Sequence, residues 1–586
     1  MNPSGTVALR RYNAFLMLVA GLGGLLYGID VGIIGSAYPY LEATSHLSPD
    51  RLSDIVAAVL LGSVFSTLFA GLLADWVGRK RLMVLSGLVF VASIPIIALA
   101  SGFGPLLAGR LLQGISGGLI GIVVPLYLAE CLGAENRGKG TGVFQWLLTL
   151  GIVAAAGIGV YFSYRVAFVA RTESAEALFQ FKDNAWRSIF WVSLPPGVLF
   201  VIGSLFVSES PRWLFRRGQV DKARTALLCS RTPEQAEREL QEMVQVAHAA
   251  RPTGSKAADS ILRRKYVIPF LLACAILFLN QGTGINSIIG YNTGILLQSG
   301  LSDVAAHWGY VLFTTVNFVL TMVGMQFVDR SGRRFLVLLG TGGIIASLVG
   351  VGLLFVSSEK RTVDATTAVQ ALVGSDQQLT LKFDRAEAAR LIAGRTGSVE
   401  PDRAALTVIY SYGDFIAASN SVRSDDASAD PIKIDRQECV PANRVEAIFK
   451  NPMANIDSAR TAPLRIQRAT VAAIPSARHG WLVAAGLYCF IAFFAIGPGV
   501  VVWLALSELM PTRIRSNGMS IALVLNQLLA ATLAGIFLPF VGRWGYSAIF
   551  FLFAGFTGAY FVIALFFLPE TKGKTLEEIE AHFEKS

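Results

Sequence analysis

Charged residues are scarce in this sequence. Only 15% of its 586 residues are Asp, Glu, Lys or Arg, whereas an average soluble protein has about 25%. Hydrophobic residues make up 53%, and they gather in repeated runs long enough to cross about 30 Å of lipid hydrocarbon. Only helices and closed barrels satisfy their backbone groups within lipid. The composition therefore excludes an ordinary soluble protein and predicts a helical protein that crosses a membrane many times.

Paired cysteines are also lacking. The five cysteines are Cys131, Cys229, Cys274, Cys439 and Cys489, and their spacing indicates neither a disulfide framework nor a metal site. We expect no metal and no other cofactor. The net charge is +10, but basic residues in a membrane protein report the topology of its loops. Nucleic acid is therefore not an expected partner.

Twelve apolar runs are predicted to span the bilayer, six on each side of a charged central segment. Their approximate bounds are 15–37, 54–73, 82–100, 104–129, 141–161, 189–207, 266–298, 308–328, 335–356, 481–506, 516–541 and 547–568. The first run has no small-residue cleavage site, so we interpret it as a retained span and not as a signal peptide.

Basic residues in the short loops predict the orientation of the chain. They follow even-numbered spans at residues 79–81, 137–139, 330–334 and 513–515. The loops after odd-numbered spans contain fewer, although the fifth is an imperfect case with Arg165, Arg171, Lys182 and Arg187. The excess of positive charge places the loops that follow even-numbered spans in the cytoplasm, together with both termini. We expect an integral protein of the cytoplasmic (plasma) membrane, in contact with the lipid bilayer.

Two segments between the spans are soluble in character. Residues 208–265 alternate charges and alanines at helical spacing, which predicts short amphipathic helices on the cytoplasmic surface. Residues 357–479 follow the ninth span and should lie outside the cytoplasm. This insert is too long for a structureless loop, so we expect a small folded domain, with a strand near 379–383 and a helix near 385–392. It has no catalytic or metal-binding set, and its partner, if it has one, is unidentified.

These segments divide the chain into six parts. They are the N-terminal six-helix half (1–207), the cytoplasmic helical linker (208–265), helices 7–9 (266–356), the insert (357–479), helices 10–12 (480–568) and a cytoplasmic tail (569–586).

One charge lies deep inside the first span. Between residues 15 and 37 only Asp30 is charged, and a carboxylate near the bilayer centre costs at least a few kcal/mol unless it is paired, hydrated or protonated. Two interpretations stay open. Asp30 is a structural carboxylate with a permanent partner, or it takes up and releases a proton in a transport pathway.

A charged signature occurs once in each half. Residues 75–80 read Asp-Trp-Val-Gly-Arg-Lys, and residues 329–334 read Asp-Arg-Ser-Gly-Arg-Arg. A second pair of charges repeats after the fourth and tenth spans. These residues are Glu130 with Arg137 and Glu508 with Arg515. Helix caps and topology charges explain a single copy well, but matched copies in both halves are typical of a duplicated transporter with alternating access.

Three further motifs accompany the repeats. They are Arg110-Leu111-Leu112-Gln113-Gly114, Ser208-Glu209-Ser210-Pro211-Arg212-Trp213-Leu214 after span six and Pro569-Glu570-Thr571-Lys572-Gly573 after span twelve. In combination, these motifs resemble the sugar porter branch of the major facilitator superfamily, over nearly the whole chain apart from the insert. The resemblance implies an all-α membrane protein with the major facilitator fold, and a transporter rather than an enzyme. It further implies proton-coupled import of a monosaccharide (a hexose or a pentose), as in bacterial xylose and glucose symporters.

The resemblance implies a set of sugar-binding residues within the membrane. In chain order they are Gln145, Asn280, Gln281, Asn286, Tyr291, Asn317, Trp503, Asn526 and Gln527. The chemistry agrees, because carboxamides donate to and accept from sugar hydroxyls without burying a charge. An indole ring packs on the C–H face of a pyranose. The alternative is that these amides join helices to one another, which is common in membranes.

The resemblance also implies roles for the charged residues. Asp30 and Arg110 are implied as the proton-coupling pair, in which protonation of Asp30 releases Arg110 and deprotonation restores the pair. The repeated clusters are implied as a cytoplasmic gate. Its residues are Asp75, Arg79, Glu130, Arg137, Glu209, Arg212, Asp329, Arg333, Arg334, Glu508 and Arg515.

Three departures from the family pattern leave the identity of the sugar open. Asn280 stands where the family usually has a glutamine, Ala495 replaces an acidic residue, and Val502 replaces a proline, which predicts a milder kink in the tenth helix. Three alternatives to monosaccharide symport also stay open. They are facilitative uniport of a sugar or polyol, transport of a different solute on the same scaffold, and a non-transporting sugar sensor that uses the insert.

Overall fold

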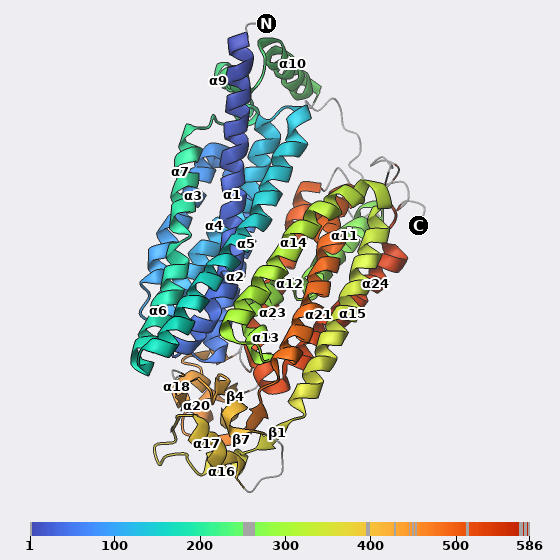
Figure 1. Cartoon of the computed structure of the whole chain (residues 1–586). Helices are drawn as coiled ribbons and strands as arrows, with labels where there is room; N and C mark the ends of the chain where they lie inside the picture. The colour runs from blue at the N-terminus through green and yellow to red at the C-terminus, as the bar shows by residue number, and fades with distance from the viewer. Residues whose placement is uncertain are drawn as a thin grey trace.

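The chain forms a bundle of long helices with a small mixed domain at one end (Figure 1). The computed structural model describes residues 3–249, 264–393, 399–426, 429, 431–444, 446–447, 451, 454–510, 515–572, 578 and 583. Among them, twelve helical stretches are long and apolar enough to cross a membrane, which is the predicted number.

The spans form two halves of six. The N-terminal half consists of α1 (Pro3–Thr44), α2 (Pro49–Val77), α3 (Arg79–Ala98), α4 (Phe103–Cys131), α5 (Ala134–Thr172), and α6 (Ala175–Trp191) continued by α7 (Leu194–Phe206). The C-terminal half consists of α11 (Arg264–Gly282) with α12 (Ile285–Gly290) and α13 (Asn292–Gln298), α14 (Asp303–Ser331), α15 (Arg333–Glu359), α21 (Ala477–Ile496) with α22 (Pro498–Leu509), α23 (Arg515–Trp544) and α24 (Tyr546–Phe567).

Glycines allow the helices within a half to approach closely. Gly28 of α1 lies against α5, where an added Cβ would stand 1.8 Å from the Leu148 carbonyl oxygen. Gly114 of α4 lies against α2 in the same way, with a Cβ 2.0 Å from the Val59 carbonyl oxygen. Lipid tails are as apolar as the side chains, so close backbone packing at small residues is what drives such helices together.

The fifth and sixth spans are longer than predicted. The loop expected between residues 161 and 189 is wrong, because α5 continues to Thr172 and α6 begins at Ala175. Two of the basic residues that made this loop an exception are paired with acids. Lys182 forms an ion pair with Asp426 of the insert, and Arg187 forms one with Asp183, each at 2.9 Å. Their charge therefore serves local contacts at the insert end of the bundle.

Two spans are broken. The seventh, predicted as one helix over 266–298, ends at Gly282 and restarts as α12 and α13, with Gly284 at φ +79° in the break. The tenth breaks at Gly497, where α21 ends and α22 begins, while Val502 lies inside α22. Irregular backbone at membrane depth occurs where protein or a cavity satisfies it, and in transporters such broken helices often form the binding site.

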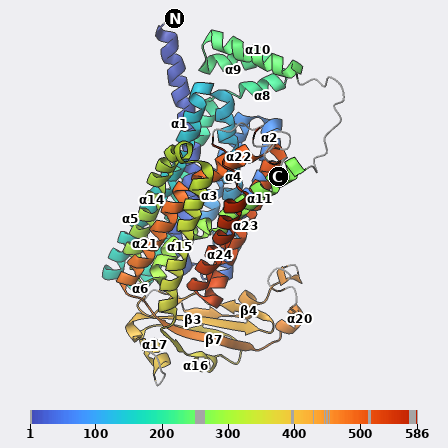
Figure 2. The same ribbon diagram turned by 90° about the vertical axis from the view of Figure 1, so that its right-hand side faces the viewer.

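The two halves contact each other at the end that carries the insert (Figures 1 and 2). Tyr310 of α14 donates a hydrogen bond to the Gly32 carbonyl oxygen of α1, and Tyr40 of α1 donates one to Asp303 of α14, each at 2.9 Å. The hydrogen bonds that described residues of one half make with those of the other lie at this end. Towards the opposite end the ribbons of the two halves diverge (Figure 1).

Short helices lie at the end opposite the insert, as predicted for the segment after the sixth span. They are α8 (Pro211–Arg216), α9 (Val220–Ser230) and α10 (Pro233–Ala249), grouped above the N-terminal half in Figure 2. Residues 250–263 of this segment lie outside the described part.

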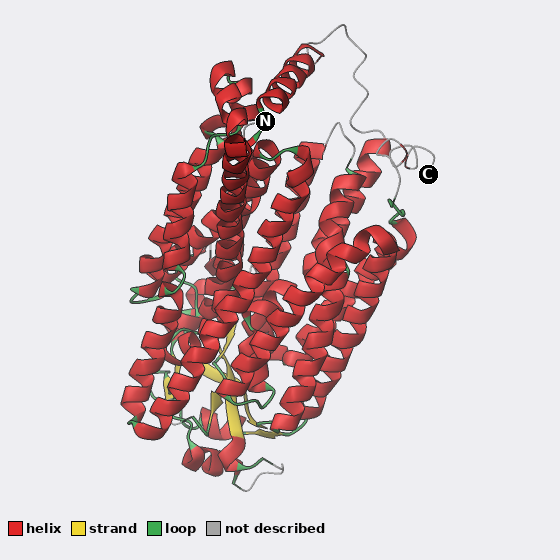
Figure 3. Cartoon of the chain, turned by 45° about the horizontal axis from the view of Figure 1, so that its top comes forward, coloured by secondary structure: helices red, strands yellow, loops and turns green. Residues whose placement is uncertain are grey.

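The insert forms a small α+β domain with a hydrophobic core of its own. Figure 3 shows that the strands gather at this end of the molecule. The strands are β1 (Thr362–Asp364), β2 (Leu379–Leu381), β3 (Ala404–Tyr412), β4 (Phe415–Ala418), β5 (Val422–Arg423), β6 (Ile432–Ile434) and β7 (Leu464–Ala473), and the described helices are α16 (Thr366–Gln370), α17 (Arg385–Ile392), α18 (Arg436–Cys439), α20 (Ile456–Ala459) and the short 3₁₀ helix η1 (Pro401–Arg403).

An antiparallel sheet forms the centre of this domain. Its order is β1-β7-β3-β4, with β5 paired to β3, and β2 pairs with β6 separately. The strand predicted near 379–383 and the helix predicted over 385–392 are confirmed as β2 and α17. The expected start of the insert at residue 357 is slightly early, because α15 continues to Glu359 before β1 begins.

Candidate functional site

Asp30 of α1 and Arg110 of α4 face each other inside the N-terminal half. Both side chains are about 1% exposed, and the Asp30 Oδ1 atom lies 3.8 Å from an Arg110 Nη atom. Neither carboxylate oxygen of Asp30 has a hydrogen-bond partner among the described residues. Arg110 is therefore a loose ionic partner, which weakens the interpretation of Asp30 as a fully satisfied structural carboxylate.

Gln113 provides Arg110 with a second partner. The Arg110 Nη atom donates a hydrogen bond of 2.6 Å to the Gln113 side-chain oxygen, one helical turn further along α4. Arg110 also lies over the Phe190 ring, at 5.6 Å from its centroid. Sequence reasoning did not assign a role to Gln113, although it lies in the Arg110–Gly114 motif at the i, i+3 spacing that brings helical neighbours together.

Three of the predicted amides form one hydrogen-bonded chain in the C-terminal half. The Asn286 amide of α12 donates to the Gln281 oxygen at 2.9 Å, and the Gln281 amide of α11 donates to the Asn526 oxygen of α23 at 3.1 Å. The Asn526 amide in turn donates to the Leu277 carbonyl oxygen at 2.8 Å. The network joins the broken seventh span to α23, so these three amides connect helices in this conformation.

Two further predicted amides have an unused acceptor. The side-chain oxygens of Asn280 and Gln527 are buried and have no hydrogen-bond partner among the described residues. A buried acceptor without a donor costs about 1–3 kcal/mol. A ligand hydroxyl that donated a hydrogen bond to either oxygen would remove that cost.

Gln145 and Asn317 lie on facing helices of opposite halves. Both side chains are half-buried, on α5 and α14 respectively. Their neighbours Trp146 and Phe318 contact each other, with ring centroids 5.9 Å apart. The two residues therefore lie at the same level of the contact between the halves.

Tyr291 lies where the two halves meet, on the insert side of the amide network. We call the contact of Tyr291 with Tyr38, Ser53, Ala534 and Phe537 the seam. Its hydroxyl lies 3.3 Å from the Ser53 hydroxyl of α2 and donates to the Ala534 carbonyl oxygen of α23 at 3.0 Å. Its ring stacks on Phe537 at 4.4 Å and meets Tyr38 of α1 edge-on at 5.2 Å. Tyr291 thus contacts both halves.

Four predicted residues cannot be placed at side-chain level. Trp503, Arg137, Asp329 and Arg515 lie in helices, but their side chains are outside the described part.

The N-terminal copy of the charged cluster lies at the end opposite the insert. Buried Arg79 contacts Glu130 through two nitrogens, at 2.8 and 3.0 Å, and Asp75 at 2.8 Å. Glu209 accepts hydrogen bonds from the backbone N–H groups of Arg79 and Lys80 at 3.0 and 3.1 Å. Arg212 is exposed.

The C-terminal copy repeats this arrangement. Arg333 contacts Glu508 at 3.1 Å, and Glu570 accepts hydrogen bonds from the backbone N–H groups of Arg333 and Arg334 at 2.9 and 3.2 Å. Burial opposes ionisation of Glu570, but these bonds and those from Lys572 and Thr571 outweigh it and lower the pKa of its carboxyl group. Glu570 therefore has the place in the second half that Glu209 has in the first.

Among the side chains that the structure describes, the clusters are built within each half and not across the two. The described ion pairs of Arg79 and Arg333 join helices of the same half. In this conformation they hold the ends of each half together, while the contact between the halves lies at the opposite, insert end.

The sequence matches a known family over most of its length. The pattern of the family described as "Sugar (and other) transporter" matches residues 16–373 and 466–583. The unmatched residues between them all belong to the insert, so this part of the domain is an addition to the family's common core.

Among curated proteins, the chain is similar to several transporters. It is 28% identical to the human proton myo-inositol cotransporter over 579 residues, which cover 97% of this chain and 82% of that protein. It is 26% identical to the glucose transporter GlcP of Staphylococcus epidermidis over 576 residues, covering 97% of each chain.

Solved structures show the same fold. The proton:xylose symporter XylE bound to 6-bromo-6-deoxy-D-glucose matches with a TM-score of 0.60 and 20% identity, covering 98% of this chain and 99% of that one. A partially occluded inward-open structure of the E. coli xylose transporter matches with a TM-score of 0.64 and 19% identity, covering 96% and 100%. The predicted major facilitator architecture is thus confirmed.

Proposed function

The chain belongs to the sugar transporter family of the major facilitator superfamily, and we propose that it imports a monosaccharide or a closely related polyol together with a proton. The observation that carries this proposal is the buried pair of Asp30 and Arg110, held at 3.8 Å without a hydrogen bond. A carboxylate in such a place can exchange its partner for a proton at little structural cost.

The proposed substrate site combines the amides on both sides of the contact between the halves. Gln281, Asn286 and Asn526 already bond to one another, so a sugar would replace amide–amide bonds with amide–hydroxyl bonds of similar strength. Asn280 and Gln527 would gain a donor for their unpaired oxygens. Gln145 and Asn317 would contact the same molecule from the facing helices.

Coupling follows from the two states available to Asp30. When Asp30 is ionised, its attraction to Arg110 holds α1 against α4. When it is protonated, that attraction is lost, and Arg110 keeps Gln113 as its partner. A proton can therefore change the relative stability of two arrangements of the N-terminal half, which is what coupling to alternating access requires.

The direction of transport rests on the proposed orientation. We place the insert outside the cytoplasm and the charged clusters inside, as the basic loops predict. In that orientation Tyr291 would belong to an outer gate, and its contacts with both halves support a state that is closed to the outside. An importer must pass through this state to release its substrate into the cytoplasm.

Uptake of a labelled panel of D-glucose, D-xylose and myo-inositol into proteoliposomes, with and without an inward proton gradient, tests the proposal. We expect concentrative uptake of at least one compound, abolished by a protonophore. Uptake that only equalises the concentrations of the compound on the two sides, with or without the proton gradient, would instead indicate a uniporter. Binding without any uptake would indicate a sensor.

A further inference from the structure

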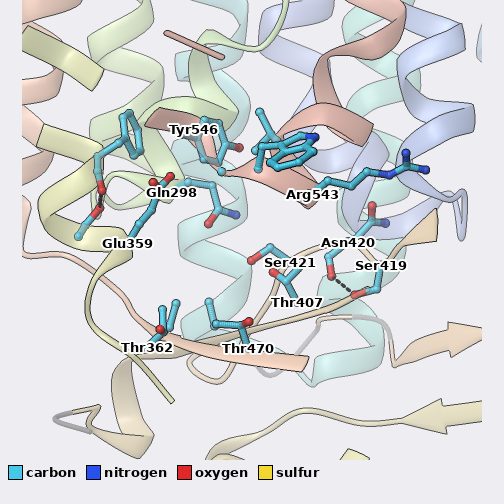
Figure 4. Close-up of a pocket in the computed structure, with 18 of the residues that line it drawn as sticks. Gln298, Glu359, Thr362, Thr407, Ser419, Asn420, Ser421, Thr470, Arg543 and Tyr546 are labelled. Carbon is cyan, nitrogen blue, oxygen red and sulfur yellow. Dashed lines mark hydrogen bonds between the residues drawn. The ribbon is translucent and has the colours of Figure 1, made fainter. Parts of the chain in front are cut away.

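A cavity of about 360 Å³ lies between the insert and the ends of the membrane helices (Figure 4). It is lined by residues from the insert, from both halves and from the loop before α24. Its volume falls in the range of sites that bind small molecules, about 300–1,000 Å³. None of the residues assigned above to the proposed transport site lines this cavity.

The floor of the cavity is one face of the insert sheet. Side chains alternate between the two faces of a strand. Leu406, Val408 and Val471 point into the core of the insert, so the residues between them point towards the membrane. Thr407 and Thr470 are direct partners across β3 and β7, and Figure 4 shows both on the floor of the cavity.

The polar groups on this lining are mostly neutral and unused. The side chains of Thr407, Thr470, Ser421 and Gln298 line the cavity and make no hydrogen bond to another described residue. The Asn420 amide donates to the Leu47 carbonyl oxygen at 3.0 Å, but its own side-chain oxygen is buried and has no partner among the described residues. Hydroxyls and amides that both donate and accept suit a ligand with several hydroxyl groups.

Several of the charged groups around the cavity are already engaged. Glu359 accepts hydrogen bonds from the backbone and hydroxyl of Ser547, at 3.1 and 2.5 Å. Arg543 donates to the Ile416 carbonyl oxygen, and Glu42 is hydrogen bonded to Tyr38. Arg468, the other charged residue of the lining, is exposed. The unengaged groups inside therefore favour an uncharged ligand.

The roof of the cavity leads directly to the closed seam of the transporter. Tyr546 lines the cavity and contacts Phe537, with ring centroids 6.3 Å apart. Phe537 stacks on Tyr291. Three aromatic rings in contact, those of Tyr546, Phe537 and Tyr291, thus lead from the cavity to the contact between the halves.

We propose that this cavity is a second binding site, in which one molecule of a monosaccharide or polyol is held outside the closed Tyr291 seam before transport. The inference rests on the proposed function, since it takes the same class of ligand. Tyr546 would pack on the C–H face of the ring, as aromatic rings do, while Thr407, Thr470 and Asn420 would bond its hydroxyls.

Saturation binding of radiolabelled D-glucose, D-xylose and myo-inositol to the purified full-length protein tests this site. For the compound that is transported, wild type should bind two molecules per chain. The double variant T407V/T470V keeps the shape of both side chains but removes both hydroxyls. It should weaken binding at the second site about tenfold or more, leaving one molecule per chain at the same ligand concentration.

Two further variants separate a lost site from a damaged domain. The variant T407S/T470S retains the hydroxyls and should bind two molecules. Thr380→Val, on the exposed face of β2 away from the cavity, should also bind two. Gln281→Ala should weaken binding at the site within the membrane several-fold and leave binding at the site under the insert unchanged.

The outcomes distinguish this inference from the proposed function. One molecule per wild-type chain, unchanged in T407V/T470V and with normal proton-driven uptake, would overturn the second site and leave the transporter intact. If no compound of the panel binds or is taken up, the proposed function fails, and the second site fails with it.

Discussion

At the residue scale, Asp30 and Arg110 are the charges on which the proposed proton coupling depends. They lie on different helices of one half and are shielded from solvent, so a change in the protonation of one is felt strongly by the other. Gln113 keeps Arg110 hydrogen bonded in either state, which is the reason we expect Arg110 to tolerate the loss of its ionic partner.

Replacing Asp30 by asparagine tests the proton site. The amide has nearly the same shape but cannot be ionised, so we expect the accumulation ratio to fall to about 1 while exchange of labelled for unlabelled sugar continues. Uptake and exchange in proteoliposomes measure both. Normal accumulation by the Asp30→Asn variant would remove Asp30 from coupling.

Replacing Gln281 by alanine tests the amide network. The change leaves Asn286 without its acceptor and Asn526 without its donor, and it removes two groups from the proposed sugar site. We expect substrate affinity to fall several-fold, about fivefold for each hydrogen bond of 1 kcal/mol that is lost.

The matched control for this change is Gln326→Ala, at an exposed position of α14, which should bind with wild-type affinity. If Gln281→Ala bound equally well, the network would be structural, and the substrate would lie elsewhere.

At the scale of elements, close contact of backbones fixes how the helices pack. Gly28→Ala places a methyl group 1.8 Å from the Leu148 carbonyl oxygen, which belongs to the backbone and cannot turn away. Overpacking of this kind typically costs about 1–3 kcal/mol. We expect a lower melting temperature in detergent, measured by thermal unfolding of the purified protein.

Gly71→Ala is the matched control, because a Cβ at Gly71 of α2 has no neighbouring atom within 4 Å. It should unfold at the wild-type temperature. Equal melting of the Gly28 and Gly71 variants would contradict the packing described for α1 and α5.

The carboxyl group of Glu570 connects the end of α24 to the turn between α14 and α15. Its pKa lies below the ordinary value of 4.5 in the folded protein. A lowered pKa means that the ionised carboxylate stabilises the folded state. This stabilisation is fully present above the pKa of the unfolded state, and it disappears as the pH falls through the pKa of the folded state.

Glu570→Gln should therefore lower stability at neutral pH, by about 1 kcal/mol for the weakened hydrogen bonds. The difference from wild type should shrink below pH 4.5, the ordinary pKa of the group. Thermal unfolding measured from neutral pH down to the lowest pH at which the purified protein stays soluble tests this. Glu173→Gln, at an exposed position after α5, is the control. A difference that grows in acid would contradict the assignment.

At the scale of the whole molecule, the insert forms polar contacts with both halves. On the N-terminal half, Asp426 pairs with Lys182 and Asn420 bonds to Leu47. On the C-terminal half, Arg423 donates to the Leu297 carbonyl oxygen at 3.2 Å, and Arg543 bonds to Ile416 of β4. In the transport cycle that we propose, opening the seam at Tyr291 would break some of these contacts, so we expect the insert to favour the state that is closed at its end.

Removing one of these contacts should make the seam open more often. In a cysteine-free background, Ser53→Cys places a thiol beside Tyr291, and its labelling by a membrane-impermeant maleimide reports opening. We expect Lys182→Ala to raise the labelling rate several-fold, because an ion pair that is partly buried is lost. Thr380→Cys, exposed on the insert, should label equally in both backgrounds. An unchanged rate at position 53 would show that the insert does not affect opening.

The periodic and local features of this fold were predictable from the sequence. Apolar runs had to become helices, because lipid offers the backbone no other partner, and the duplicated charges identified two related halves. The motif after each half contained Glu209 and Glu570, but their equivalent contacts with the turns at Arg79 and Arg333 became apparent only in three dimensions.

The sequence by itself determined the class of protein, the number of spans and the identity of the candidate residues, because these depend on composition and local spacing. Only the tertiary structure decided where α5 and α6 end, that Gln281 bonds to Asn526, that Tyr291 contacts both halves, and that a cavity lies between the insert and the helix ends. These depend on contacts between residues hundreds of positions apart, such as Asn420 with Leu47. Local sequence does not encode such pairings, because packing of the whole chain selects them.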